Sequence, residues 1–423
     1  MTTVELPTLH TGQVEAYKKR GRFTAVRCGR RWGKTILGEV IACDAAIKKG
    51  NVGIFAPDYK ILAETYHEII NILDPVKKSG SRIDGVIRTT TGGRLDFWTL
   101  DNERAGRSRA YHVVIIDEAA FAKPNMMQIW NTAIRPTLLD YAGTAWVLSN
   151  TNGVDPDNFF WRICNEPQHG FTEFHAPTRT NPYLPAEELE KLQRENHPLV
   201  YSQEYLAEFV DWAGIQFFSQ EDLLVNGQPV AMPERVDGVF AVIDTAIKTG
   251  KEHDGTAVSY WSSSQFNGHP LVCLDWDIVQ VEGSLLETWL PSVFQNLESL
   301  ARDTKARAGS LGVHIEDKVS GTILLQQALR HGWDARPIDT KLTALGKDER
   351  AISVSGYVFQ KKVKISAPAF HKTAVYKGQA KNHFLSQVLG FRIADKLAST
   401  RSDDLLDTFT YAVSLALGNA GGY

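Results

Sequence analysis

This chain has few cysteines, no long apolar run and no large excess of either charge. Its 423 residues include four cysteines, which lie far apart without a Cys-x-x-Cys pair or a histidine at ligand spacing, namely Cys28, Cys43, Cys164 and Cys273. That spacing argues against structural zinc and against a disulfide framework. No stretch approaches the roughly 20 apolar residues that span a bilayer, and the N-terminus lacks a charged-then-apolar signal pattern. We therefore expect an intracellular protein without a membrane segment.

The overall charge and length set further bounds. A net charge of −3 gives no global basic signature of nucleic-acid binding, so any contact with DNA must be local. At roughly 150 residues per domain, the length predicts two or three domains. No internal repeat or low-complexity tract interrupts the chain.

A glycine-rich segment near the N-terminus predicts a phosphate-binding loop. Residues 28–35 read Cys-Gly-Arg-Arg-Trp-Gly-Lys-Thr, between a predicted strand at 24–27 and a predicted helix at 34–49. In such a loop the free N–H groups at the start of the helix bind phosphate oxygens. Lys34 would reach the terminal phosphates of ATP, and Thr35 would hold magnesium. The remaining loop residues assigned to nucleotide binding are Gly29, Arg30, Arg31 and Gly33.

A second segment supplies the acids that this chemistry needs. Residues 113–118 read Val-Val-Ile-Ile-Asp-Glu, an apolar run typical of a buried parallel strand that ends in two acids. Asp117 would support the magnesium and Glu118 would polarise the attacking water. Cys28 stands where the common loop pattern has glycine, so a Gly-Lys-Thr turn that opens some other helix is the alternative. The strand, turn and helix context favours the ATP site.

Alternating strands and helices predict an α/β protein with two folded parts. The expected strands of the first part lie at 52–56, 95–99, 113–116 and 145–148, in a pattern typical of a mainly parallel sheet. A helical stretch follows at 186–210. The second part begins at residue 238, with expected strands at 239–243, 256–261, 271–276 and 313–315 and then helices to the end. The predicted divisions are a domain at 1–210, a linker at 211–234 and a domain at 235–423.

Acidic residues in the second part form another constellation. They stand at predicted strand ends, in a turn, and at the start of the last helix, namely Asp244, Asp254, Glu316, Asp403, Asp404 and Asp407. Gathered carboxylates repel one another unless a divalent cation neutralises them. Two such ions about 4 Å apart stabilise the attacking and leaving oxygens of phosphodiester cleavage, and oxygen ligands favour Mg²⁺ or Mn²⁺. Alternatively, Asp403 and Asp404 only cap a helix.

With both parts in view, the sequence resembles the large subunit of a tailed-phage terminase, a motor that packages viral DNA and cuts it into genome lengths. The resemblance covers nearly the whole chain. It rests on the phosphate loop, the Asp-Glu strand and five further segments, which are Leu-His-Thr-Gly-Gln at 9–13, Ala-Pro-Asp-Tyr at 56–59, Arg-Ser-Arg at 107–109, Leu-Ser-Asn-Thr-Asn-Gly at 148–153 and Gln-Glu-Tyr-Leu-Ala-Glu-Phe at 203–209.

The resemblance implies roles for further residues of the first part. Gln13 would lie against adenine, and Ser149 and Asn150 would belong to the motif that couples hydrolysis to movement, although they are equally a polar turn after a strand. Arg107 would act as an arginine finger on a neighbouring subunit's phosphate, with Arg104 and Arg109 as the next candidates. A basic loop that only touches DNA phosphate explains Arg107 as well. Arg30 and Arg31 grip phosphates or face solvent.

For the second part, the resemblance implies a ribonuclease-H-like nuclease with a mixed sheet. Asp244, Glu316 and Asp404 would bind the two metals, with Asp254 as an accessory acid and Asp403 as the rival to Asp404. The basic run at 361–364 would track DNA or form a solvated face. The implied partners are double-stranded DNA, a portal protein, a small terminase subunit and further copies in a ring, in the host cytoplasm. The rival interpretations are a helicase-like ATPase whose second domain grips DNA without cutting it, and a nucleotide-gated scaffold protein.

Overall fold

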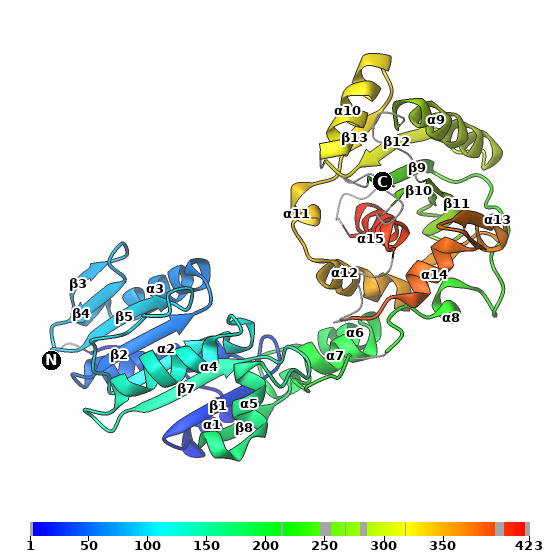
Figure 1. Ribbon diagram of the computed structural model, residues 1–423. Helices are drawn as coiled ribbons and strands as arrows, with labels where there is room; N and C mark the ends of the chain where they lie inside the picture. The colour runs from blue at the N-terminus through cyan, green and yellow to red at the C-terminus, as the bar shows by residue number, and fades with distance from the viewer. Residues whose placement is uncertain are drawn as a thin grey trace. The chain divides into compact units, whose positions relative to one another are not determined.

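A computed structural model describes residues 3–212, 215–245, 255–266, 268–279, 286–317, 319–393 and 402–418. The chain divides into two compact units (Figure 1). Unit 1 comprises residues 1–193 and 198–211, and unit 2 comprises residues 194–197 and 212–423. Within the described residues, no helix combines the length and apolar character that crossing a membrane requires.

Unit 1 is built on one large sheet whose described strands run in the order β3-β4-β5-β2-β6-β7-β1-β8. The strands are β1 (Phe23–Cys28), β2 (Asn51–Ala56), β3 (Lys77–Ser81), β4 (Val86–Thr89), β5 (Arg94–Thr99), β6 (Val113–Asp117), β7 (Thr144–Ser149) and β8 (Thr172–Ala176). Strands β5, β2, β6, β7, β1 and β8 pair in parallel, whereas β3 and β4 join antiparallel at one edge. This is the mainly parallel sheet predicted from the alternating pattern.

Helices cover both faces of this sheet. They are α1 (Thr11–Lys18), α2 (Lys34–Ile47), α3 (Tyr59–Ile72), α4 (Met126–Ile129) and α5 (Phe159–Asn165). Successive strand residues alternate between two cores, because side chains of a strand point to opposite faces. Ile54 and Ile115 pack with α2 and α3, whereas Phe55 and Val114 pack with α4 and α5. Strands buried on both faces explain the continuous apolar runs in the sequence.

The helical stretch expected at 186–210 is divided. Helix α6 (Ala186–Glu195) ends before α7 (Pro198–Glu204) begins. Proline has no backbone N–H and its ring clashes inside a helix, but it fits the first position of a new one. Pro198 therefore marks a new start.

Unit 2 is built on a mixed sheet in the order β13-β12-β9-β10-β11-β14. The strands are β9 (Gly238–Asp244), β10 (Thr256–Ser263), β11 (Leu271–Val279), β12 (Ser310–Ile315), β13 (Ala335–Pro337) and β14 (Val363–Ile365), with a separate hairpin of β15 (Ala374–Tyr376) and β16 (Gln379–Lys381). Strands β9, β10 and β11 are antiparallel, and β12 joins β9 in parallel. The prediction of helices alone after residue 315 is wrong, because four strands of three residues each lie among them.

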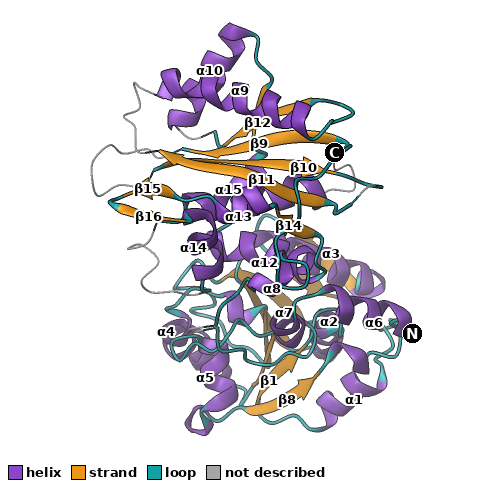
Figure 2. Cartoon of the chain, turned by 90° about the vertical axis from the view of Figure 1, so that its right-hand side faces the viewer, coloured by secondary structure: helices purple, strands orange, loops and turns teal. Residues whose placement is uncertain are grey.

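Helices of unit 2 also lie on both faces of its sheet (Figure 2). They are α8 (Gln220–Leu223), α9 (Leu286–Asp303), α10 (Val319–His331), α11 (Thr340–Thr343), α12 (Lys347–Phe359), α13 (Ala367–His371), α14 (His383–Gly390) and α15 (Asp404–Leu417). Leu290 and Leu297 of α9 pack on Val239 and Ile243 of β9. Helix α15 lies on the opposite face, where Phe409 contacts Trp261 of β10 with ring centroids 5.9 Å apart. This sandwich brings the start of α15 to the carboxyl end of β9.

Candidate functional site

The phosphate loop of unit 1 connects the end of β1 to the start of α2, as predicted. Gly33 precedes the helix with φ 102°, in a region where only glycine is unstrained. Gly29 is required for a different reason, because a Cβ there would lie 2.3 Å from Thr178 Oγ1. Cys28 ends β1 and is fully buried, so its side chain packs in the core beneath the loop.

Side chains from outside the loop fix its backbone. Four backbone carbonyl groups of the loop accept hydrogen bonds from these side chains. The pairs are Thr178 Oγ1 to Arg30 O at 2.7 Å, Asn181 Nδ2 to Arg31 O at 2.7 Å, His10 Nε2 with Trp32 O at 2.9 Å, and Gln13 Nε2 to Gly33 O at 2.7 Å. Trp32 is fully buried and donates from Nε1 to Thr180 Oγ1 at 2.9 Å. Bonds to so many carbonyl groups hold the turn in one conformation.

These contacts give Gln13, which the resemblance places against adenine, partners within the protein. Gln13 is buried and its amide is engaged on both sides, since Oε1 accepts from His10 N at 2.8 Å while Nε2 bonds the loop. Trp32 is a packing residue of the core beside the loop. Sequence reasoning missed His10, Thr178 and Asn181, because nothing in their local sequence predicts a contact with a loop up to 150 residues away.

The two functional groups at the start of α2 are both engaged. Lys34 is buried and its Nζ donates to Cys28 O at 3.0 Å and Gly29 O at 3.3 Å. Thr35 Oγ1 donates to Asp117 Oδ2 at 3.0 Å, which joins the loop to the end of β6. The residues assigned to magnesium therefore lie together, and their hard oxygen atoms are the ligands that this ion prefers.

The acids that end β6 are strongly affected by burial. Burial raises the pKa of Asp117, and the hydrogen bond from Thr35 and the charge of Lys34 oppose this shift. Burial likewise raises the pKa of Glu118, whose backbone adopts φ 51°, uncommon for a residue other than glycine. Ser149 Oγ accepts from Ala120 N at 3.1 Å and lies 3.5 Å from Glu118 Oε2. Ser149 thus lies beside the predicted catalytic acid.

A cavity of about 860 Å³ opens beside the loop, large enough for a nucleotide. Its lining includes the predicted site residues Arg30, Thr35, Asp117, Glu118 and Asn150. Its opposite wall is acidic, with Asp58, Glu64 and Glu68 of the loop before α3 and of α3 itself. An acidic cavity is a poor site for a phosphate unless a cation accompanies it, which fits the assignment of Thr35 and Asp117 to a divalent ion.

Glu39 is the most perturbed acid of this cavity. It lies one turn after Thr35 on α2, is 6% exposed and lines the cavity. Burial, followed by the charges of Glu68 and Asp117, raises its pKa from 4.5 to about 8. The sequence analysis did not identify Glu39; its position four residues after Thr35, on the same helical face, is the signal that could have found it.

The arginines take different positions. Arg30 Nε pairs with Glu204 Oε2 at 2.6 Å, and Asn150 Nδ2 donates to the same oxygen at 3.0 Å. Arg31 is exposed. Arg107 and Arg104 lie exposed in the loop after β5, whereas Arg109 Nε is 3.5 Å from Asp96 Oδ2 and is tied to the fold. Glu204 is a further residue that the sequence analysis missed.

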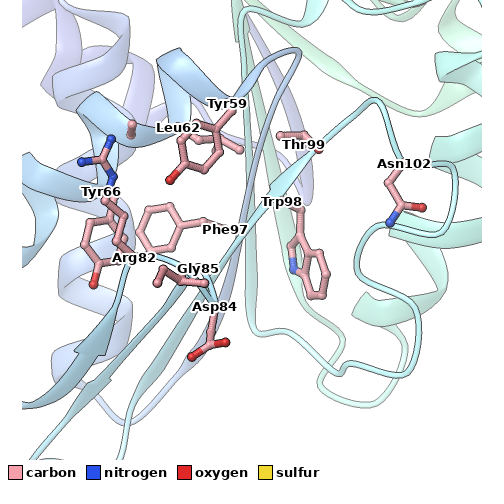
Figure 3. Close-up of a pocket in the computed structure, with 12 residues that line it drawn as sticks. Tyr59, Leu62, Tyr66, Arg82, Asp84, Gly85, Phe97, Trp98, Thr99 and Asn102 are labelled. Atoms are coloured by element: carbon pink, nitrogen blue, oxygen red, sulfur yellow. The ribbon is translucent and has the colours of Figure 1, made fainter.

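A second hollow of unit 1 lies away from the phosphate loop and has an aromatic lining (Figure 3). Its volume is about 240 Å³. Tyr59 and Tyr66 of α3 lie beside Phe97 of β5, whereas Trp98, the next residue of the strand, lies on its other side. Arg82 lies at the edge of the hollow. None of the predicted site residues lines this hollow, so the acidic cavity is the candidate nucleotide site.

In unit 2, three of the predicted acids come together where β9, β12 and α15 meet. Asp244 is the last residue of β9, and Glu316 follows β12, which pairs with β9 in parallel. All three carboxyl groups are buried, with 9% exposure for Asp244, 3% for Glu316 and 4% for Asp404. Burial, the charge of Asp407 and the hydrogen bond with Glu316 raise the pKa of Asp244 well above its usual value.

The structure separates the two neighbouring aspartates at the start of α15. Asp404 Oδ2 accepts from Gly255 N at 3.4 Å and its charge acts on Asp244. Asp403 instead forms an ion pair with Lys347 of α12. Asp407, one turn along α15, was considered in the sequence but not assigned to the metal; after burial it has the largest effect on Asp244.

Metal-binding geometry is incomplete in the described part of unit 2. Asp254, the accessory acid, lies outside the described residues. Among described residues, no group of three or more His, Cys, Asp or Glu side chains is arranged to hold a metal ion. The carboxylate oxygens nevertheless match the chemistry of a hard divalent cation, which would offset the like charges that raise the pKa of Asp244.

The basic run at 361–364 does not form one surface. Lys364 is 2% exposed and donates from Nζ to Asp222 O at 2.7 Å and Leu224 O at 2.9 Å. Lys361 is exposed and Lys362 is half-buried. Lys364 is therefore a structural cation, so neither alternative, a run that tracks DNA or a solvated face, holds for all of residues 361–364.

Comparisons with known proteins identify the fold. No protein-family model and no curated protein sequence matches the chain. Among solved structures, the large terminase of a thermophilic bacteriophage is similar at 14% identity. The superposition on its complex with ADP covers 97% of the present chain and 99% of the terminase chain, with a TM-score of 0.61. Its complex with ATP-gamma-S covers 96% and 98%, with a TM-score of 0.58. The predicted α/β fold, with a mainly parallel sheet in the first part and a mixed sheet in the second, is confirmed, and it is similar to the fold of the large terminase.

Proposed function

We propose that this chain is a terminase large subunit, which hydrolyses ATP to move double-stranded DNA into a procapsid and cuts the DNA with a metal-dependent nuclease. The observation that carries the proposal is the presence of two separate polar sites in one terminase-like fold. One is the braced phosphate loop whose Thr35 contacts Asp117, and the other is the carboxylate group around Asp244. Binding of ADP and ATP-gamma-S by the similar bacteriophage protein supports a nucleotide at the first site.

At the first site, the residues divide the work of phosphoryl transfer. Magnesium, held by Thr35 and Asp117, would neutralise charge on the phosphates. Lys34 leaves the carbonyl groups of Cys28 and Gly29 and donates to the terminal phosphates, which are stronger acceptors because they are charged. Glu118 orients the water for in-line attack on the γ-phosphate. Burial favours the protonated form of Glu118, and the charge of Lys34 opposes this rise in pKa and so favours the ionised form.

Arg107 is our candidate for a finger that acts on a neighbouring copy. Its side chain lies on an exposed loop of unit 1 and is therefore accessible to another subunit. An arginine supplied in this way is worth roughly 10³ to 10⁵ in rate, so the chain should hydrolyse ATP slowly unless it is assembled. This supports a ring of copies as the active form.

A route for coupling hydrolysis to movement follows from the contacts after β7. Ser149 lies beside Glu118, and Asn150 shares Glu204 with Arg30 of the phosphate loop. Loss of the γ-phosphate would remove negative charge near Arg30 and so alter its ion pair with Glu204. Because Asn150 bonds the same oxygen of Glu204, its position would change as well. We assign Ser149 and Asn150 to coupling on this basis.

At the second site, Asp244, Glu316 and Asp404 would hold two divalent cations, Mg²⁺ or Mn²⁺, with Asp254 as a further ligand. Such ions supply activated water and stabilise the leaving oxygen of a phosphodiester. The chain's own groups position that chemistry: Tyr411 donates to Glu316 Oε1 at 2.8 Å and fixes its orientation. Neither site requires base recognition, so contacts with DNA should be mainly to the backbone.

The further partners are a portal protein and a small terminase subunit, in the cytoplasm of the host. The similar bacteriophage protein is named a large terminase, which implies a packaging complex but not its individual members. The main rival is a helicase-like ATPase whose unit 2 grips DNA without cutting it. The second rival, a nucleotide-gated scaffold, would bind ATP without hydrolysis that DNA stimulates.

The ATPase part of the proposal is tested by the rate of phosphate release with and without double-stranded DNA. DNA should raise the rate, and Lys34→Ala should lower it by at least about a hundredfold, in line with loss of transition-state charge stabilisation. Mixing Arg107→Ala chains with Glu118→Gln chains should restore activity, because each variant supplies what the other lacks. Nucleotide binding without DNA-stimulated hydrolysis would favour the scaffold rival.

A further inference from the structure

Helix α12 of unit 2 presents two cations to the acids of the proposed nuclease site. Lys347 and Arg350 are three residues apart, so they share one face of the helix. Lys347 forms an ion pair with Asp403 and lies 3.9 Å from Asp407 Oδ2. Arg350 Nη2 contacts Asp407 Oδ1 at 2.5 Å. Two acids at the start of α15, Asp403 and Asp407, are therefore paired with cations of the protein itself.

Arg350 is embedded in this site. Its residue is 6% exposed, its Nη1 donates to Leu345 O at 2.6 Å, and its Cζ lies 4.7 Å from the centre of the Tyr411 ring. Tyr411 in turn donates to Glu316. The Nε of Arg350 is buried and has no hydrogen-bond partner among the residues that the structure describes. This N–H group belongs to a buried guanidinium beside the acids of the proposed nuclease site, and a positively charged donor of this kind suits an anionic ligand.

Lys347 differs from Arg350 in its freedom to move. Its side chain is 32% exposed, against 7% for Arg350, and it stands in the first turn of α12. A lysine side chain is a flexible point charge that can change partner by rotation about its own bonds, whereas an anchored guanidinium cannot. Lys347 can therefore exchange one ion-pair partner for another, whereas Arg350 stays in one position.

We propose that Lys347 and Arg350 are internal counter-ions of the nuclease acids, that their charges, held beside Asp404 by Asp403 and Asp407, oppose the binding of divalent cations at Asp404, and that Lys347 moves to the DNA phosphate when metal is bound. The proposal rests on the proposed nuclease function of unit 2. It follows from the ion pairs that Lys347 forms with Asp403 and Arg350 forms with Asp407, on either side of Asp404. Binding of a divalent ion supplies positive charge to the acids, repels Lys347 and leaves it free for an incoming phosphate.

The first test is metal affinity, measured by calorimetric titration of Mn²⁺ into the full chain without nucleotide. Heat that Asp244→Ala removes is assigned to unit 2. Lys347→Met should tighten this binding by about two- to fivefold, the range that one partly exposed ion pair supports. The matched control is Lys305→Met, because Lys305 pairs with Glu234 at 2.9 Å on the surface of unit 2 and should leave the affinity unchanged.

The second test is DNA affinity, measured by fluorescence anisotropy of a short duplex over a range of salt concentrations. With Ca²⁺ present, Lys347→Met should weaken binding and lower the log–log salt slope by about one, as expected for one lost phosphate contact. In EDTA the slopes of wild type and variant should agree, because Lys347 is then held by Asp403. A purely structural lysine would not give a difference that depends on the cation.

The outcomes separate the inference from the function on which it rests. Asp244-dependent Mn²⁺ binding that Lys347→Met leaves unchanged or weakens would overturn the inference alone, as would equal salt slopes in Ca²⁺. No Asp244-dependent Mn²⁺ binding in the wild type would overturn the nuclease proposal and the inference with it. Arg350→Met is the less useful variant, because it leaves Asp407 buried without its closest partner.

Discussion

Replacing Glu39 by glutamine should stabilise unit 1, and the gain should grow as the pH rises. Glu39 is 6% exposed and its pKa is raised from 4.5 to about 8 by burial and then by the charges of Glu68 and Asp117. Its folded pKa lies above its unfolded pKa, so the folded state resists ionisation. The resulting penalty is absent below about pH 4.5 and increases up to about pH 8.

The size of this effect follows from the pKa difference. At 1.36 kcal/mol per pKa unit, the raised pKa of Glu39 lowers the free energy of unfolding by about 3 kcal/mol at pH 7 and by under about 1 kcal/mol at pH 5. Glu39→Gln keeps the shape of the side chain and removes the charge. For a unit of this size, roughly 2–4 °C per kcal/mol gives a rise in melting temperature of about 6–12 °C at pH 7.

The assay is differential scanning calorimetry of wild type and Glu39→Gln at pH 5, 7 and 8 in EDTA. The matched control is Glu64→Gln, since Glu64 lines the same cavity but is exposed on α3. The control should change the melting temperature by less than about 2 °C, as surface substitutions usually do. A gain for Glu39→Gln that is equal at pH 5 and pH 8, or a loss of stability at pH 7, would refute the reasoning.

Three further outcomes follow from buried contacts. Trp32→Ala should lower the free energy of unfolding by about 3–5 kcal/mol in urea titrations, because Trp32 is fully buried; a loss below about 1 kcal/mol would contradict its packing role. Tyr411→Phe should cost about 1–2 kcal/mol in the same titrations, because it removes the 2.8 Å hydrogen bond to Glu316, and an unchanged stability would argue against that bond. Asp244→Asn should stabilise the chain in EDTA more at pH 8 than at pH 5, because the raised pKa of Asp244 makes its ionisation unfavourable in the folded state. A melting temperature of the variant below that of the wild type at pH 8 would refute this.

The features that could be predicted from sequence are those encoded in local patterns. Residues 113–117 are apolar and then acidic, which is sufficient to place Asp117 at the carboxyl end of a buried strand. The glycine-rich turn before Lys34 is equally local. Strands β9 and β12 were predicted separately, and their parallel pairing brings Asp244 and Glu316 together.

The features that could not be predicted depend on long-range contacts or on short polar strands. Thr178 bonds a loop 148 residues away, and no periodicity reports such a contact. The β3 strand reads Lys-Lys-Ser-Gly-Ser and is largely exposed, so it lacks the apolar alternation that identifies a strand. The different surroundings of Asp403 and Asp404 arise from Lys347, which lies 56 residues earlier. Adjacent acids at a helix start are indistinguishable without that contact.

The most direct test of the account is cleavage of supercoiled plasmid DNA by the purified full chain with Mn²⁺ or Mg²⁺, followed on a gel. Wild type, Asp244→Ala and Lys34→Ala should be compared at equal concentration, and each variant serves as the control for the other. The account predicts nicking and linearisation that Asp244→Ala abolishes and Lys34→Ala retains, which would establish a nuclease separable from the ATPase. Measurable ATP hydrolysis without cleavage by the wild type in either metal would contradict it and favour the helicase-like alternative.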